Sequence, residues 1–253
     1  YGFDNIAAAL TVTAGLLERY LITAQQISRM AIGDAAMRPV GTTYAMSFFE
    51  LQDQRMSEDL PFGSRGGLSV NHYFPVDGDY DLQIRLQRSV VNLGGGIRGL
   101  DEVEHIDVRL DDKLVQRFTL GGGDDEQDGD TRGPYTETEL ERFADDELKL
   151  RFPAAAGMRK VGVTFVRQHW VQEGVGMERL PIQSYGFASS RKSGRDYGKI
   201  EMGVDTVEVR GPFDASTPEA TASREKIFVC QPTTGPVKRS ESEQSCAQDI
   251  LGR

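Results

Sequence analysis

The sequence has few of the residue types that build metal centres or membrane spans. Its 253 residues include three histidines and no His-Glu-x-x-His motif, so a histidine-rich metal centre is not expected. The Cys-x-x-Cys-His motif that attaches c-type haem is absent as well. No apolar run approaches the roughly 18 residues that a membrane-spanning helix needs. We therefore expect neither a haem bound by this chain nor direct membrane insertion.

Basic residues are outnumbered by acidic ones, and the formal net charge is −10. An acidic chain repels phosphate backbones and anionic lipid headgroups, so nucleic acid is not an expected partner. Hydrophobic residues still make up 38% of the sequence, which is enough for a packed core. The length fits one large β domain with an additional segment, or two small domains.

Residues 4–33 have a helical pattern. Asp4 can cap a short helix, and Thr13 can cap a longer one. In the longer segment apolar residues recur at three- and four-residue steps, which predicts one apolar stripe. The stripe consists of Leu17, Tyr20, Leu21, Ala24, Ile27 and Ala31. One amphipathic helix is not stable alone in water, so we expect this helix to dock on something else.

After Pro39 the hydrophobic pattern alternates with a period of two, which predicts β-strands. Leu82, Ile84 and Leu86, for example, alternate with polar side chains. The predicted strands are 44–51, 66–74, 80–87, 105–112, 114–120, 147–152, 159–168 and 199–211, with an Asp-Asp-Lys turn joining the fourth and fifth as a hairpin. Strands with one polar and one apolar face, and no helices between them, predict a mainly β protein of two antiparallel sheets packed face to face.

Several stretches resemble parts of large exported proteins of planctomycetes and related bacteria, which combine c-type cytochrome modules with domains of unknown function. The stretches are YGFDNIAAALTVTAGLLERYLITAQQISRMAIGD (1–34), LPFGSRGG (60–67), YFPVDGDYDLQIRL (73–86), LRFPAAAGMRKVGVTFV (150–166), and KIFVCQP with SCAQDIL in the tail (226–251). The resemblance implies an internal segment of a longer protein, with a periplasmic or extracellular location. Residues 1–38 would end a preceding domain, 39–213 would form the β-sandwich, and 214–253 would be a linker and the start of a following domain. Any haem would lie in neighbouring domains or subunits.

The central part also resembles jelly-roll carbohydrate-binding modules. The resemblance is carried by the run Phe-x-x-Asp-Gly-x-Tyr-x-Leu-x-Ile at 74–84 and by VDTVEVRGPF at 204–213, where an edge strand would end in Gly-Pro. It implies an antiparallel jelly-roll sandwich that binds sugars with exposed aromatic rings and polar side chains, often beside a structural calcium ion.

The acidic run GGGDDEQDGD (121–130) is a candidate calcium site. Asp124, Asp128 and Asp130 could coordinate Ca²⁺ together with backbone carbonyls. The spacing matches only the first half of an EF-hand loop, because the twelfth position is Tyr135 instead of Glu. The alternative is an acidic loop in solvent, which is the commoner role of such runs.

The segment 169–198 contains the single tryptophan and a mixture of aromatic and basic side chains, which predicts a ligand-binding loop. An exposed Trp170 could stack on a pyranose ring. The other candidate ligand-binding residues are Tyr185, Arg191, Arg195 and Tyr197. Arginines beside aromatic rings could grip a sugar acid or another anion. In the alternative interpretation, Trp170 closes one end of the core and the basic residues lie in water.

Cys230 and Cys246 are the two cysteines. Their spacing suits a local disulfide, which requires an oxidising compartment. The alternative is a pair of free thiols in a C-terminal tail.

These features favour a non-catalytic module that binds a glycan within a larger exported, cytochrome-linked protein. One alternative is a docking scaffold that contacts neighbouring protein subunits of a redox complex. A second is a polysaccharide hydrolase, which needs a pair of carboxylates at a set separation. The many Asp and Glu residues single out no pair, and no nucleophile-elbow motif is present. We therefore expect any enzymatic or redox activity to lie outside this chain.

Overall fold

The computed structural model describes residues 13–48, 50, 52–88, 96–100, 103–122, 142–167, 202–230 and 239–252. Their strands are β1 (Val40–Ala45), β2 (Ser64–Phe74), β3 (Asp77–Leu86), β4 (Glu104–Leu110), β5 (Lys113–Leu120), β6 (Lys149–Ala154), β7 (Gly157–Val166) and β8 (Val204–Ser216). Their helices are α1 (Ala14–Ile32), the 3-10 helix η3 (Ala144–Glu147), α4 (Ala222–Ile227) and α5 (Arg239–Leu251).

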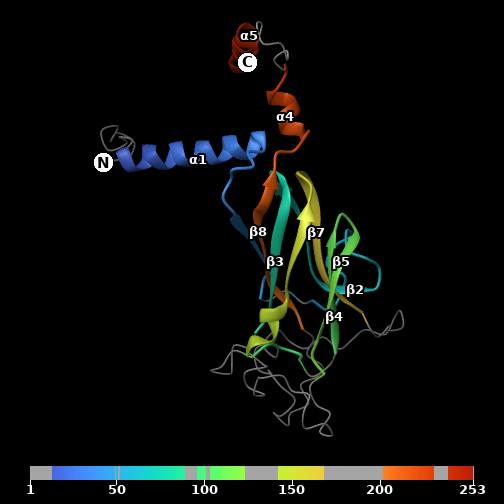
Figure 1. The fold of residues 1–253 in the computed structure, drawn as a ribbon. Helices are drawn as coiled ribbons and strands as arrows, with labels where there is room; N and C mark the ends of the chain where they lie inside the picture. The colour runs from blue at the N-terminus through green and yellow to red at the C-terminus, as the bar shows by residue number, and fades with distance from the viewer. Residues whose placement is uncertain are drawn as a thin grey trace, which may run out of the picture.

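The strands form two four-stranded antiparallel sheets, with the orders β1-β8-β3-β6 and β2-β7-β4-β5 (Figure 1). The first strand pairs with the last, the second with the seventh, the third with the sixth and the fourth with the fifth. This nested pairing is the topology of a jelly roll, in which the chain folds back at β4–β5 and rolls into two layers. The predicted antiparallel jelly-roll sandwich with an N-terminal helix is confirmed.

Alternating side chains build one core between the sheets. Leu82, Ile84 and Leu86 of β3 are buried, as are Val161, Val163 and Phe165 of β7, all as the period-two pattern predicted. Phe74 packs edge-to-face on Tyr80, with ring centroids 4.6 Å apart.

The predicted Asp-Asp-Lys turn connects β4 to β5. Asp111 and Asp112 have φ angles of 47° and 67°, the left-handed conformation that a two-residue type I′ turn requires at both positions. The Asp111 carboxylate accepts hydrogen bonds from Arg159 Nη1 at 2.7 Å and from the Lys160 backbone N–H at 3.1 Å. The turn is therefore tied to β7, the strand that lies beside β4.

Two strand predictions were wrong in position. β1 covers Val40–Ala45 and not 44–51, because the apolar run after Ala45 belongs to the connection toward β2. The run 204–213 is not an edge strand, because β8 lies between β1 and β3 and continues to Ser216. Gly211 and Pro212 form a bulge opposite Tyr80 in the pairing with β3. Gly211 is the last residue of β8 that pairs with β1, so Pro212, which has no N–H, lies just beyond that pairing.

Gln52 connects the two sheets through its side-chain amide. Nε2 donates to the Val204 carbonyl at 2.7 Å, and Oε1 accepts from the N–H groups of Val204 and Gly67, both at 2.9 Å. Gly67 lies in a bulge of β2 with φ of 77°, where a Cβ would collide with the Val163 carbonyl oxygen. The amide thus satisfies backbone groups of β8 and of the β2 bulge, so one buried side chain stabilises both sheets.

α1 begins and ends as the sequence predicts. Thr13 Oγ1 accepts from the Leu16 N–H at 3.3 Å, and Gly33 ends the helix with φ of 64°. The C-terminal end is held by Tyr73, whose hydroxyl donates to the Met30 carbonyl at 3.3 Å, and by Arg224 of α4, which donates to the Ile32 carbonyl. The rest of α1 projects away from the sandwich (Figure 1).

The expected docking of the α1 stripe does not occur among the described residues. No α1 residue is buried, and Leu17, Tyr20, Leu21 and Ile27 are 52–63% exposed. The predicted short helix after Asp4 lies outside the described residues. The range 214–253 contains the last residues of β8, then α4 and α5.

Substituting Gln52→Ala should lower the free energy of unfolding by about 2–4 kcal/mol, because buried backbone groups of Gly67 and Val204 lose their partner. Urea unfolding measures this change. Gln116→Ala on β5 is the matched control; its side chain is exposed, and its substitution should stay within about 0.5 kcal/mol of the wild type. Equal, small effects of both substitutions would show that the Gln52 bridge does not stabilise the sandwich.

Candidate functional site

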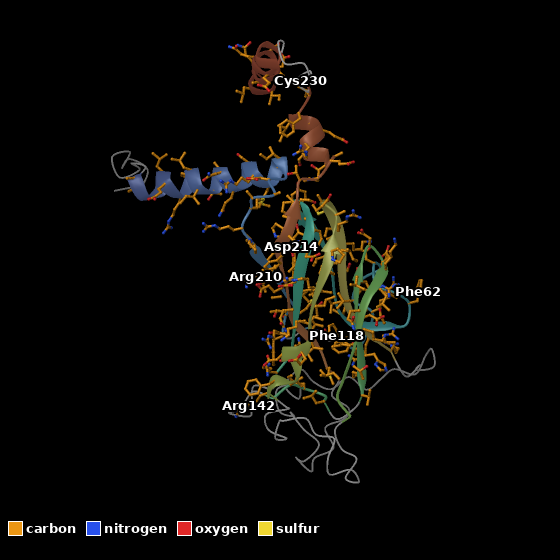
Figure 2. The ribbon with its side chains drawn as sticks, viewed as in Figure 1. Phe62, Phe118, Arg142, Arg210, Asp214 and Cys230 are labelled. Atoms are coloured by element: carbon orange, nitrogen blue, oxygen red, sulfur yellow. A yellow bond between two sulfur atoms is a disulfide. The ribbon has the colours of Figure 1, made fainter. Side chains whose placement is uncertain are left out.

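The outer face of the β1-β8-β3-β6 sheet gathers charged side chains from three adjacent strands. The register places Asp81 of β3 directly between Arg210 of β8 and Arg151 of β6. One row further along, Asp79 pairs with Phe213. We define the polar face as Asp79, Asp81, Arg151, Glu208, Arg210, Phe213 and Asp214. Figure 2 shows Arg210 and Asp214 along β8.

Asp81 and Arg151 form the centre of the polar face. Arg151 donates from Nε to Asp81 Oδ1 at 2.6 Å and from Nη2 to Oδ2 at 2.9 Å, a bidentate pair. The Arg151 guanidinium also lies 4.3 Å from the centre of the Phe213 ring. The Arg151 guanidinium is therefore held at its edge by the Asp81 carboxylate and on one face by the Phe213 ring.

The charges around this pair reinforce one another. The hydrogen bond from Arg151 is the largest effect and lowers the pKa of Asp81. Burial opposes it, and the positive charges of Arg151 and Arg210 lower the pKa further, so that the net shift is downward. In the same way the hydrogen bond with Asp81 raises the pKa of Arg151, with contributions from the charges of Asp79 and Asp214. Both members of the pair are ionised at neutral pH.

The polar face offers both hydrogen-bond donors and hydrogen-bond acceptors. It holds planar carboxylate and guanidinium groups in fixed positions beside an aromatic ring, which suits hydrogen bonding to hydroxyl groups. Among its residues no serine or cysteine lies beside a base, as nucleophilic catalysis would require. Within the described ranges, no group of three His, Cys, Asp or Glu residues is arranged to hold a metal ion.

The buried charges of the chain serve the fold. Asp145 of η3, which is fully buried, accepts from Arg88 Nη2 at 2.8 Å and from the Leu86 N–H at 3.0 Å. Arg65 donates to Glu104 at 2.6 Å and lies 4.5 Å from the centre of the Phe165 ring. Both pairs hold strand ends in place. The Arg65–Glu104 pair is buried on both sides, and removing one partner of such a pair is strongly destabilising.

The sequence-predicted binding and metal residues lie outside the described residues. These are Trp170, Tyr185, Arg191, Arg195 and Tyr197 for the ligand, and Asp124, Asp128 and Asp130 for calcium. The chain leaves the described structure after Gly122 and Arg167 and re-enters it at Arg142 and Met202.

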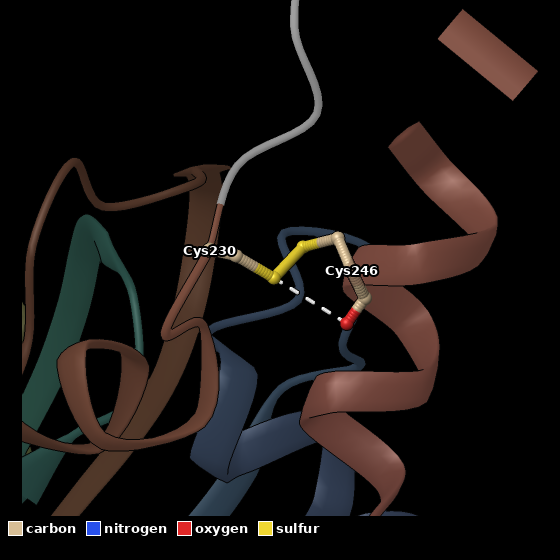
Figure 3. Close-up of a disulfide and its surroundings, with 2 residues drawn as sticks. All are labelled: Cys230 and Cys246. Atoms are coloured by element: carbon tan, nitrogen blue, oxygen red, sulfur yellow. Dashed lines mark hydrogen bonds between the residues drawn. A yellow bond between two sulfur atoms is a disulfide. The ribbon is translucent and has the colours of Figure 1, made fainter. Parts of the chain in front are cut away.

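Cys230 and Cys246 are joined by a disulfide with Cα atoms 5.7 Å apart (Figure 3). The Cys230 Sγ also lies 3.3 Å from the Cys246 carbonyl oxygen. The bond connects the segment after α4 to α5, and every cysteine of the chain is used in it.

Sequence reasoning did not find the polar face. The alternation in 80–87 does place Asp81 on the polar side of its strand. Its neighbours Arg151 and Arg210 are 70 and 129 positions further along the sequence, and only the strand register brings them together. The alternation within each strand shows which residues point outward. It does not show which strands are neighbours, so finding the polar face also required the nested strand pairing.

Comparison with known proteins identifies one segment. A family model described as PSD3, a protein of unknown function (DUF1587), matches residues 1–33. The match agrees with the expectation that the opening stretch resembles a domain of unknown function. No curated protein matches the chain. Among the described residues, no helix is long and apolar enough to cross a membrane.

Asp81→Asn should lower the free energy of unfolding at pH 7 by up to about 1 kcal/mol, because both partners of the ion pair are partly exposed. The pKa of Asp81 is lowered in the folded state, so its stabilisation is present above the unfolded pKa of about 3.9 and disappears as pH falls through the folded pKa. Denaturation curves from pH 7 to pH 2 should therefore converge for wild type and variant. Glu147→Gln, at a well-exposed carboxylate, is the control with no expected effect. A wild-type advantage that persists at pH 2 would contradict this assignment.

Proposed function

We propose that this chain is a non-catalytic binding module for a glycan, within a larger exported and cytochrome-linked protein. The observation that carries the proposal is the polar face, where the Arg210–Asp81–Arg151 row lies beside Phe213 on the outer surface of a jelly-roll sheet. The resemblance to carbohydrate-binding modules and the jelly-roll topology support it.

A glycan fits the chemistry of the polar face better than the other ligand classes. Sugars present rows of hydroxyl groups that both donate and accept, and the face offers both carboxylate acceptors and guanidinium donors. Alternating charges of opposite sign favour such a ligand over a polyanion, as does the net charge of −10. The Cys230–Cys246 disulfide supports a periplasmic or extracellular location.

A polysaccharide hydrolase has less support. Among the described carboxylates, burial raises the pKa of Asp205, as a general acid requires. The carboxylate whose charge adds to this rise is Asp145, which is fully buried and hydrogen-bonded to two arginines and a backbone N–H. It is not available to act on a substrate as nucleophile or base.

Calorimetric titration with a panel of neutral and uronic-acid polysaccharides, with and without calcium, tests the glycan proposal. We expect at least one polysaccharide to bind, and Arg151→Ala to weaken it about tenfold or more through loss of a charged hydrogen bond. Lys113→Ala, on an edge strand of the other sheet, should leave the affinity unchanged. Comparing the two calcium conditions tests a role for Asp124, Asp128 and Asp130. Absence of heat with every polysaccharide in both conditions would refute the proposal.

A second candidate function, docking to a neighbouring protein domain or subunit, is favoured by α1. Its exposed leucine, isoleucine and tyrosine side chains form a continuous apolar stripe that the described residues leave uncovered. A contiguous exposed apolar surface is a feature of protein contact sites. The family match over residues 1–33 includes α1 and none of the strands, which supports treating α1 as a unit separate from the sandwich.

A photoreactive residue at position 21, on the stripe of α1, should cross-link to protein in the intact native assembly. The matched control is position 19, where Arg19 lies on the opposite, polar side of the helix. Mass spectrometry identifies the linked segments. Equal cross-linking from both positions, or none from position 21, would argue against a docking role for the stripe.

A further inference from the structure

β1 is a free edge that lacks the usual protection against pairing. Within the part of the chain that the structure describes, it pairs with β8 alone, and all its residues are exposed except the half-buried Tyr44. Its sequence, VGTTYA, contains no charge, no proline and no bulge. Unpaired backbone groups on such an edge are a template for another strand.

The other three sheet edges carry protective features. β6 contains Lys149, Arg151 and Pro153, and β5 contains Lys113 and Arg117. β2 has a bulge at its start, and Arg55 forms a bridge to Gly66 beside it. Charges, proline and bulges are the devices that keep edges from associating. β1 is thus the exception within this sandwich.

We propose that β1 binds β1 of a second copy of this chain, antiparallel, about a two-fold axis at Thr42. The two β1-β8-β3-β6 sheets then join into one continuous eight-stranded sheet. A two-fold contact of this kind is self-complementary, which is the commonest symmetry of soluble oligomers.

Charges beside the edge select this register. Arg210 lies next to Gly41 on the outer face, and Glu208 lies next to Thr43. With Thr42 opposite Thr42, Gly41 faces Thr43 of the second copy, so each Arg210 shares a row with a Glu208 of the second copy. Shifting the centre to Gly41 or to Thr43 would instead align Arg210 with Arg210 or Glu208 with Glu208. Like charges in one row oppose association.

The small side chains of β1 leave space for these charges to meet. A Cβ at position 41 would collide with Oε1 of Glu208, so the Glu208 carboxylate already lies over the edge strand. Three strand spacings, about 14 Å, separate Arg210 and Glu208 Cα atoms across the joined sheet. Among the described residues, neither Arg210 nor Glu208 forms an ion pair within its own chain. Both are available for the second copy.

The side chains on the other face of β1 also match themselves. In this register Thr42 faces Thr42, and Val40 faces Tyr44 of the second copy. Threonine pairs and pairs of an aromatic with a β-branched residue are among the favourable cross-strand contacts. Val40 is 58% exposed in the single chain, so this pairing would cover apolar surface.

Sedimentation equilibrium from about 10 µM to about 500 µM tests the proposal. The wild type should self-associate to a dimer, and Thr42→Lys should weaken association at least tenfold by placing two lysines opposite each other. Gln116→Lys, on the edge strand β5 of the other sheet, should leave the dimer unchanged. The double exchange Glu208→Arg with Arg210→Glu should retain the dimer, whereas either single change should weaken it.

Disulfide trapping provides the second measurement. Directly opposed residues of an antiparallel pair have Cα atoms about 4.5–5.5 Å apart, within the range of a disulfide. Thr42→Cys should therefore form a covalent dimer on mild oxidation faster than the Gln116→Cys control. A monomer throughout the concentration range would overturn the proposal. Equal cross-linking of the two cysteine variants would also overturn it. A dimer that survives Thr42→Lys but is lost on Leu21→Glu in α1 would do the same, because it would place the contact on α1.

Discussion

The nested antiparallel pairing of the strands is the constraint on which the rest of this structure depends. The chain turns back on itself at Asp111–Asp112, and from that hairpin outward each earlier strand pairs with a later one. Because side chains alternate along the strands, this single pairing scheme brings the inward-facing apolar residues of both sheets, such as Leu82, Ile84, Val163 and Phe165, into one core between two layers. A shift of one residue in any strand would turn its apolar side chains toward water.

The same pairing brings together residues that are far apart in the sequence. It places the strand at 40–45 beside the one at 204–216, and it aligns Arg210, Asp81 and Arg151 across three strands. The irregular parts of the sheets are stabilised locally, by the Gln52 amide at the β2 bulge and by Asp145 at the end of β3. On the outer face, the bidentate pair of Asp81 and Arg151 fixes the relative position of a carboxylate and a guanidinium group.

Much of the fold could be predicted from the sequence, and little of the site. Strands such as β3 and β7 were predictable because their apolar residues alternate without interruption, and Thr13 and Gly33 marked the ends of α1. The position of β1 was not, because the aromatic residues just after Ala45 imitate a strand while β1 itself is mostly small and polar. The polar face was hidden because its members are ordinary exposed charges until the register places them side by side. Its discovery needed tertiary information that periodicity alone does not contain.

Nuclear Overhauser effects between backbone protons test the nested pairing most directly. The pairing predicts contacts between Thr42 and Val209, and between Val70 and Val161, across the register of β1 with β8 and of β2 with β7. Contacts of β1 with β2 and of β7 with β8 as consecutive hairpins would instead indicate a meander. That result would contradict the jelly roll and with it the polar face and the free edge of β1.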